Sequence, residues 1–264
     1  MQLIDTHCHI DVTAFDQDRP AVLERCGKLG INIIIVPGIQ RQTWDQLLQT
    51  CVSYPGLNPA LGLHPMFMQQ HTPAHLEDLN TYIEKHRPVA IGEIGLDFYQ
   101  PDSDIKQQQY YFEGQIDIAC AHHLPIILHA RKSHEAILNK LKSSPQTTGI
   151  VHAFSGSIQQ AEQYIDLGFK LGFGGMLTYE RSRKLRQLAK QLPLESIVLE
   201  TDAPDMTVAR HRGERNSPEY IIDCLTTLAE IRQQSVNEIA NQTTLNAKSI
   251  FKLNEQFIQS ENDG

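Results

Sequence analysis

The segment GIVHAFSGSIQQAEQYIDLGFKLGFGG (149–175) contains two short apolar runs on either side of one helical pattern. The runs GIVHAFSG (149–156) and GFKLGFGG (168–175) have the length and apolar content of buried strands. Between them, IQQAEQYIDLG (158–168) has helical spacing, with Ser157 as the expected N-cap and Gly168 as the stop. A strand, a helix and a second strand in this order predict a parallel pair of strands joined by a right-handed crossover.

The same alternation extends over most of the chain. Further apolar runs predict strands at 3–10, 31–38, 58–65, 88–97, 124–130 and 196–204, and helical patterns include 19–30, 106–123 and 181–192. Eight strand–helix units in 264 residues favour an α/β fold, the closed (β/α)8 TIM barrel, over an open sheet. Helical patterns at 217–232 and 236–253 follow the last strand, so we expect an extra C-terminal helix. No Pro-, Gly- or Ser-rich segment marks an internal boundary, and we expect one barrel domain at 1–254 with a polar tail at 255–264.

Composition and charge exclude several classes of protein. The chain is 41% hydrophobic and 20% charged, which is typical of soluble globular proteins, and no apolar run approaches the ~20 residues that a membrane span needs. Polar Asp5, His7 and His9 occupy the place of a signal peptide's apolar core, so we expect a cytoplasmic protein without a membrane partner. The five cysteines are scattered and predict neither a disulfide framework nor a thiolate zinc site. A net charge of −8 argues against general coating of nucleic acid, but not against a local basic patch.

Side chains that can bind a metal recur near the ends of the predicted strands. In LIDTHCHID (3–11), Asp5, His7 and His9 occupy alternate positions, which places them on one face of a regular strand. Later strands add five more such residues, namely His64, Glu93, His129, His152 and Asp202. Because the carboxyl ends of barrel strands meet at one mouth, and because buried carboxylates need a cation, this pattern predicts a metal site. Imidazole and carboxylate ligands without thiolate favour Zn²⁺, Mn²⁺, Ni²⁺ or Fe²⁺ over Mg²⁺.

Seven motifs taken together carry a resemblance to a known family. They are DTHCHID, ALGLHP, AIGEIGLDF, ILHAR, VHAFSGS, LETDAP and RNSPEY, and as a set they resemble the TatD family of metal-dependent deoxyribonucleases and hydrolases in the amidohydrolase superfamily. The resemblance implies a (β/α)8 barrel that holds two divalent metal ions per chain. It implies that one metal is bound by His7, His9 and Asp202, the second by His129 and His152, and both by a bridging Glu93. It also implies that His64 faces the substrate or its phosphate.

A ligand set of this kind favours hydrolysis, because bound metals acidify the attacking water and polarise the bond that breaks. Asp202 is the candidate to accept the proton of that water, and Glu93 and His64 are the other catalytic candidates. For Asp5 and Asp97 the preferred interpretation is that each orients a metal-binding histidine. Glu200 has three open interpretations: support of the ligands, contact with a metal, or a buried pair with a basic residue.

Basic residues gather in the loops after the fifth, seventh and eighth predicted strands: Arg131 and Lys132; Arg181, Arg183, Lys184 and Arg186; Arg210, Arg212 and Arg215. Basic loops at the mouth of an acidic protein fit a phosphate-bearing polymer, although about half of RSRKLR (181–186) is equally expected as a solvent-exposed helix face. We therefore expect a deoxyribonuclease that acts on DNA at ends or in single strands, with no obligate protein partner. The alternative is hydrolysis of carboxyl ester, lactone or amide bonds, including aminoacyl-RNA deacylation. A third interpretation is a metal-stabilised scaffold without enzymatic activity.

Overall fold

The computed structural model describes residues 1–102, 104–144 and 146–253. Within them eight parallel strands form one sheet in the order β1 to β8, so that neighbours in sequence are neighbours in space. The strands are β1 (Leu3–Asp5), β2 (Ile31–Pro37), β3 (Leu57–Leu61), β4 (Ala90–Asp97), β5 (Ile126–Arg131), β6 (Gly149–Val151), β7 (Lys170–Phe173) and β8 (Ile197–Leu199). The predicted single-domain (β/α)8 barrel is confirmed. The predicted tail at 255–264, like residue 254, lies outside the described residues.

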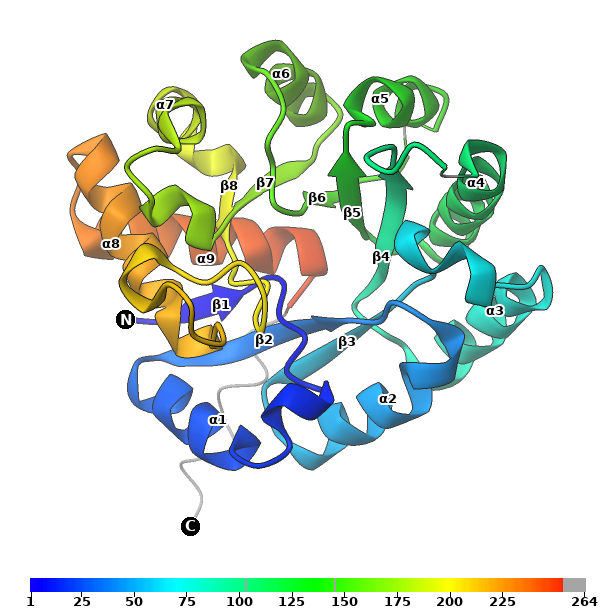
Figure 1. Ribbon diagram of the computed structural model, residues 1–264, viewed down its shortest axis with the longest axis horizontal. Helices are drawn as coiled ribbons and strands as arrows, with labels where there is room; N and C mark the ends of the chain where they lie inside the picture. Colours follow the sequence, from blue (N-terminus) through cyan, green and yellow to red (C-terminus); the bar gives the residue numbers. More distant parts are fainter. Residues whose placement is uncertain (103, 145, 254–264) are drawn as a thin grey trace.

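A helix follows each strand, and Figure 1 shows these helices arranged around the strands. They are α1 (Arg19–Lys28), α2 (Trp44–Ser53), α3 (Ala74–His86), α4 (Ile105–His122), α5 (His134–Lys142), α6 (Ile158–Asp166), α7 (Arg183–Gln191) and α8 (Ile221–Arg232), with α9 (Val236–Phe251) as the additional C-terminal helix. The predicted N-cap of α6 is confirmed, because Ser157 Oγ accepts the Gln160 N–H at 3.1 Å as part of a capping box. In the described ranges, every helix is too short or too polar to cross a membrane.

Backbone hydrogen bonds between the first and last strands close the barrel. The Thr6 N–H donates to the Leu199 carbonyl at 3.1 Å, and the Asp202 N–H donates to the His7 carbonyl at 2.8 Å. These bonds join segments from opposite ends of the described chain. The motifs DTHCHID and LETDAP are therefore side by side at the carboxyl end of the barrel.

Helix α9 closes the opposite end. Apolar side chains from the strands form one cluster with the end of α9 and the residue after its C-cap: Ile4, Ile35, Ala60, Ala90, Ile127, Ile150 and Val198 with Ala247, Ile250, Phe251 and Leu253. The Asn246 amide donates to the Leu194 and Ile197 carbonyls at 2.8 and 2.7 Å, which holds α9 against the start of β8. The motif residues His7, His9, Glu93 and Asp202 lie toward the other, carboxyl end of the strands.

Several strands end earlier than predicted, and the polar motif residues lie in the loops that follow them. β1 ends at Asp5 rather than at residue 10, because the Asp5 carboxylate accepts the His7 N–H at 3.2 Å and turns the chain. The predicted alternation of Asp5, His7 and His9 on one strand face is wrong for the same reason. β6 and β8 end before Ala153 and Asp202, whose left-handed backbones (φ 43° and 57°) interrupt an extended segment.

Candidate metal centre

Four possible ligand atoms converge after β1, in β4 and after β8. His7 Nε2 lies 3.2 Å from both His9 Nε2 and Glu93 Oε2, and Asp202 Oδ1 lies 3.6 Å from each of the two imidazole nitrogens. His9 Nε2 is 3.9 Å from Glu93 Oε2. Nitrogen and oxygen ligands at about 2.0–2.2 Å from a tetrahedral cation are roughly 3.3–3.6 Å apart, so this group fits one small divalent cation.

Glu93, in β4, is the centre of the cluster. Its Oε2 faces His7 and His9, whereas its Oε1 lies 3.0 Å from His129 Nδ1 and 3.2 Å from His64 Nε2. Burial opposes ionisation of this carboxyl group, but the imidazoles of His64 and His7 outweigh burial and hold the pKa of Glu93 well below its usual value. A carboxylate whose two oxygens face different groups of imidazoles has the arrangement of a bridging ligand.

His129 is held between two carboxylates. Its Nδ1 faces Glu93, and its Nε2 lies 3.0 Å from Asp97 Oδ2, while Asp97 Oδ1 accepts the Tyr99 N–H at 2.9 Å. Burial would lower the pKa of His129, but Asp97 and Glu93 raise it to about 9. A histidine that donates one ring N–H to a carboxylate keeps its other nitrogen for a metal. Asp97, the last residue of β4, therefore fixes the orientation of the His129 ring and leaves Nδ1 facing Glu93.

His64 has the opposite pattern of hydrogen bonds. It caps the 3-10 helix η3 (Pro65–Gln70), and its Nδ1 accepts the Met66 N–H at 3.1 Å. Nδ1 therefore carries no proton, and the proton of the neutral ring is on Nε2, which donates to Glu93 at 3.2 Å. Burial lowers the pKa of His64 and so favours this neutral form. A protonated Nε2 is a hydrogen-bond donor and not a ligand, and the substrate-facing role of His64 stays a prediction.

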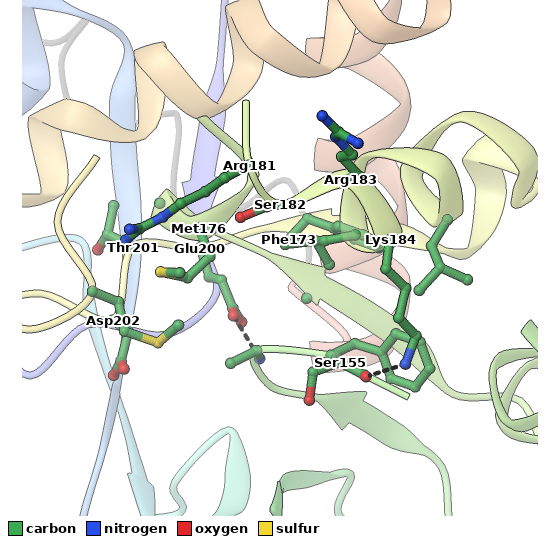
Figure 2. A pocket seen from close by; sticks show the side chains of 18 residues that line it. Ser155, Phe173, Met176, Arg181, Ser182, Arg183, Lys184, Glu200, Thr201 and Asp202 are labelled. Atoms are coloured by element: carbon green, nitrogen blue, oxygen red, sulfur yellow. Dashed lines mark hydrogen bonds between the residues drawn. The ribbon is translucent and has the colours of Figure 1, made fainter. Parts of the chain in front are cut away.

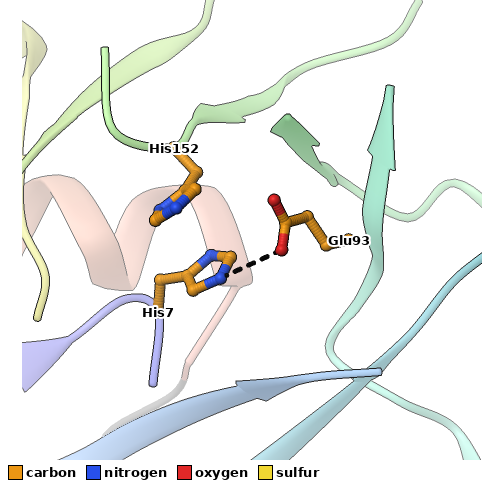
Figure 3. Close-up of side chains that lie close together, drawn as sticks. All are labelled: His7, Glu93 and His152. Atoms are coloured by element: carbon orange, nitrogen blue, oxygen red, sulfur yellow. Dashed lines mark ion pairs between the residues drawn. The ribbon is translucent and has the colours of Figure 1, made fainter. Parts of the chain in front are cut away.

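His152 enters the centre from the loop after β6. Its ring stacks on His7, with centroids 3.6 Å apart, and Figure 3 shows both rings beside Glu93. His152 Nε2 lies 3.5 Å from Asp202 Oδ2, and Nδ1 lies 3.0 Å from Glu200 Oε1. Burial opposes protonation of His152, but Glu200 and Asp202 raise its pKa well above the usual value. Glu200 and Asp202 thus stabilise positive charge at this position, as expected of a site that binds a cation.

The structure brings all six predicted metal ligands and His64 into one cluster. Their atoms form three groups of three within 4.8 Å: His7, His9 and Asp202; His7, Glu93 and His152; His64, Glu93 and His129. The first is the set that the resemblance implies for one metal. No group found in the described part of the chain contains both His129 and His152, the implied pair on the second metal. Each of these two histidines instead has a ligand atom within 4.8 Å of a Glu93 oxygen, and their assignment to one shared metal stays a prediction.

Asp5 acts on the backbone rather than on a histidine ring. Its carboxylate accepts the Thr201 hydroxyl at 2.5 Å, the Thr201 N–H at 3.0 Å and the His7 N–H at 3.2 Å. Burial raises the pKa of Asp5 to about 8. Asp5 therefore ties the loop after β1 to the loop after β8 and orients His7 through its main chain, where we had expected a contact with an imidazole.

The basic residues predicted at the mouth divide into two sets. Arg215 pairs with both oxygens of Asp18 at 2.8 and 2.7 Å, and Arg186 donates to the Leu177 carbonyl at 3.0 Å, so these two side chains hold loops in place. Arg131 is half-exposed; its guanidinium lies 4.0 Å from Asp97 Oδ2 and 3.6 Å from the centroid of the Tyr99 ring. Exposed cations beside an aromatic ring are typical of surfaces that bind single-stranded nucleic acid.

Two residues near the centre had no predicted role. Tyr99 follows the AIGEIGLDF motif directly, and its position after β4 is a signal that sequence reasoning did not use. Asn216, within RNSPEY, donates from its side-chain amide to the Thr201 and Asp205 carbonyls at 2.8 and 2.7 Å. Asn216 thereby fixes the loop that carries Asp202, which explains why an amide occurs in that motif.

Comparison with known proteins agrees with this geometry. The family described as TatD related DNase matches residues 4–252. The metal-dependent hydrolase YjjV of Escherichia coli (strain K12) is 39% identical over 255 residues, which is 96% of this chain and 98% of that protein. The crystal structure of YjjV, a TatD homolog from Escherichia coli K12, has a TM-score of 0.91 over 96% of this chain and 98% of that one, at 39% identity. A protein of Erwinia tasmaniensis named 3'-5' ssDNA/RNA exonuclease TatD is 30% identical over 260 residues, 95% of this chain and 100% of that protein.

Proposed function

We propose, since this chain belongs to the TatD related DNase family and is a metal-dependent hydrolase, that it hydrolyses phosphodiester bonds of DNA at strand ends or in single strands. The observation that carries the proposal is the Glu93 carboxylate, which has imidazole nitrogens within 3.0–3.2 Å of both of its oxygens. This arrangement supports two divalent cations, one on each side of Glu93. The name of the Erwinia tasmaniensis relative supports a nucleic-acid substrate.

The ligands present fit such cations in type and in separation. Two divalent ions held by His7, His9, Glu93, His129, His152 and Asp202 would polarise the phosphoryl group and lower the pKa of the attacking water. Ligand chemistry favours Zn²⁺, Mn²⁺, Ni²⁺ or Fe²⁺ over Mg²⁺, because four of the six ligands are imidazoles.

Asp202 is the side chain suited to accept a proton. Its side chain is 17% exposed, against 4% for Glu93, so it is the carboxylate of the ligand set that water can reach. Burial opposes its ionisation, but the charges of His152, His7 and His9 outweigh burial and hold the pKa of Asp202 below its usual value. Asp202 is therefore ionised at neutral pH, as a general base must be.

Other side chains would position the substrate. His64 Nε2–H points into the centre and can donate to a non-bridging phosphate oxygen once a substrate competes with Glu93. At the mouth, Lys132 Nζ lies 4.7 Å from the Tyr99 ring on which Arg131 also rests. Tyr99 would stack on a base while the side chains of Arg131 and Lys132 contact the backbone phosphates.

The test compares substrates on one preparation of protein. After removal of metals by a chelator, single divalent metals are added back, and a labelled single-stranded DNA oligonucleotide is assayed beside a carboxyl ester, a lactone and an aminoacyl-RNA. We expect metal-dependent cleavage of the oligonucleotide and little turnover of the carbonyl compounds. Turnover of an ester, lactone or aminoacyl-RNA without DNA cleavage under any of the metals would reject the nuclease proposal and leave a metal-dependent hydrolase of carbonyl bonds.

A further inference from the structure

A cavity of about 310 Å³ opens beside Asp202, between the loops after β6, β7 and β8. Its walls are mainly apolar and include Phe154, Phe173, Leu185 and Leu188, of which Phe173 is labelled in Figure 2. Small-molecule pockets in proteins have volumes from about 300 Å³ upward, so this cavity has room for a single ring system. Because Asp202 lines the cavity and also belongs to the metal centre, a group bound in it would adjoin the bond that is hydrolysed.

Glu200, whose exposed fraction is 1%, lines the same cavity and has one carboxylate oxygen without a partner. Its Oε1 accepts the Ala153 N–H at 2.7 Å and lies 3.0 Å from His152 Nδ1. Its Oε2 is buried and has no hydrogen-bond donor within the described residues. Residue 172 is glycine, and a Cβ atom at this position would collide with Oε2, so the space that Oε2 occupies depends on this glycine. A buried acceptor without a donor costs free energy, so Glu200 Oε2 points to a ligand that brings an N–H group.

Cationic side chains line the outer part of the cavity. Arg181, Arg183 and Lys184 belong to its lining, and Figure 2 shows Lys184 reaching the Ser155 carbonyl, to which it donates at 3.1 Å. Arg183 points away from the other labelled side chains in the same view. Across the described ranges none of these three cations forms an ion pair with a carboxylate, which leaves Arg181 and Lys184 available to an anionic group at the entrance.

We propose that this cavity binds the base of the terminal nucleotide of the substrate strand, an inference that rests on the proposed nuclease function. A base has flat apolar faces for the Phe154 and Phe173 walls, an amino group for Glu200 Oε2, and an adjoining phosphate for Arg181 or Lys184. No other part of a nucleotide combines these features, because the sugar has neither a flat face nor an N–H donor. Glu200 is thus a specificity-determining residue that recognises the edge of the base.

The test uses oligonucleotides that differ only in the 3′-terminal residue, which is 2′-deoxyadenosine, purine 2′-deoxyriboside or an abasic residue. The second lacks the amino group and the third lacks the whole base, whereas the phosphodiester bond is the same. For the wild-type protein we expect kcat/KM to fall by about tenfold or more from the deoxyadenosine to the purine substrate, because a buried carboxylate loses its donor. We expect a second fall of about tenfold or more from the purine to the abasic substrate, because an apolar pocket loses its occupant. Equal kcat/KM for the three substrates would overturn the proposal.

Two variants separate the two features of the site. In Glu200→Gln the Ala153 N–H holds the amide oxygen in place, so the NH₂ group takes the position of Oε2 and opposes the amino group of the base. We expect this variant to lose the preference for deoxyadenosine over purine and to keep the preference for purine over the abasic residue. Leu185→Trp, on α7, fills the cavity. In this variant kcat/KM for the deoxyadenosine and purine substrates should fall to the value for the abasic substrate, and the value for the abasic substrate should equal that of the wild type.

The controls distinguish a lost base site from other defects. Leu245→Trp makes the same substitution at an exposed position of α9 and should behave as wild type, and metal content is measured in every variant. A uniform loss on all three substrates in Leu185→Trp at full metal content would also overturn the proposal. If the wild type cleaves no oligonucleotide, the nuclease function fails, and the cavity is tested by calorimetry with dAMP and 2-deoxyribose 5-phosphate. Tighter binding of dAMP by about tenfold, lost in Leu185→Trp, would support a base site, and equal binding would refute it.

Discussion

Replacing Asp202 by Asn tests whether this side chain accepts the proton of the attacking water. Folding should be unaffected, because Asn adopts a left-handed backbone (here φ 57°) as readily as Asp, and the 2.8 Å backbone bonds from Asp202 to His7 and from Asp205 to Asp202 do not involve the side chain. The amide oxygen can still coordinate a metal, but an amide is no base. The single-turnover rate at saturating metal should therefore fall about 10²–10⁴-fold, or roughly 3–5 kcal/mol in activation free energy.

The assay is cleavage of an end-labelled single-stranded oligonucleotide with protein in excess, with metal content and thermal unfolding measured on the same samples. Asp205→Asn is the matched control, because it makes the same substitution at an exposed side chain three residues later and should keep the wild-type rate. An undiminished rate in Asp202→Asn would remove Asp202 as the base. A loss of rate that excess metal restores would show that Asp202 acts only as a ligand.

Three further predictions address the metal centre and the closed end of the barrel. Glu93→Gln should weaken binding of both metals, whereas His152→Ala should deplete mainly one, and equal losses at matched free metal would contradict a bridging Glu93. Asp97→Asn should weaken metal binding about 10–100-fold, measured by competition with a chelating indicator, because the Tyr99 N–H holds the amide oxygen and the NH₂ group then opposes His129 Nε2–H; unchanged affinity would reject that role. Phe251→Ala should lower the free energy of unfolding by about 3–5 kcal/mol in urea titrations with no change in metal stoichiometry, and a changed stoichiometry would show that α9 influences the site.

The barrel could be predicted because each strand–helix unit is a local pattern of apolar residues and stop signals. The extra helix could be predicted in the same way, but not its location. In α9, Ala247, Ile250 and Phe251 have ordinary helical spacing, which shows that one face is buried without showing what covers it. Only the assembled barrel shows that this face closes the amino end of the strands, and this determines at which end the site remains open.

The ends of several strands, such as β1, β6 and β8, were predicted too late in the chain, because the sequence pattern continues past the last ladder hydrogen bond. Ala153 follows GIVH without any glycine to mark a turn, yet it has a left-handed backbone and donates its N–H to Glu200. A strained φ at a non-glycine residue beside a functional group is held by tertiary contacts, which a local sequence pattern does not contain. The candidate ligands could therefore be identified by residue type, but the loops that aim them could not.

The roles of individual histidines depend on which atom faces the second ring nitrogen. His64 and His129 both follow apolar runs and both reach Glu93, so their local sequences do not distinguish a ligand from a donor. His64 Nδ1 accepts a hydrogen bond from the Met66 N–H, so Nε2 of that ring carries the proton and is a donor. His129 Nε2 donates to the Asp97 carboxylate, so Nδ1 of that ring is free for a metal. For His129 this second partner comes from the neighbouring strand β4, far away in the sequence. The motif can therefore show that His129 belongs to the site, but its chemistry there depends on a contact between two paired strands, which its local sequence does not contain.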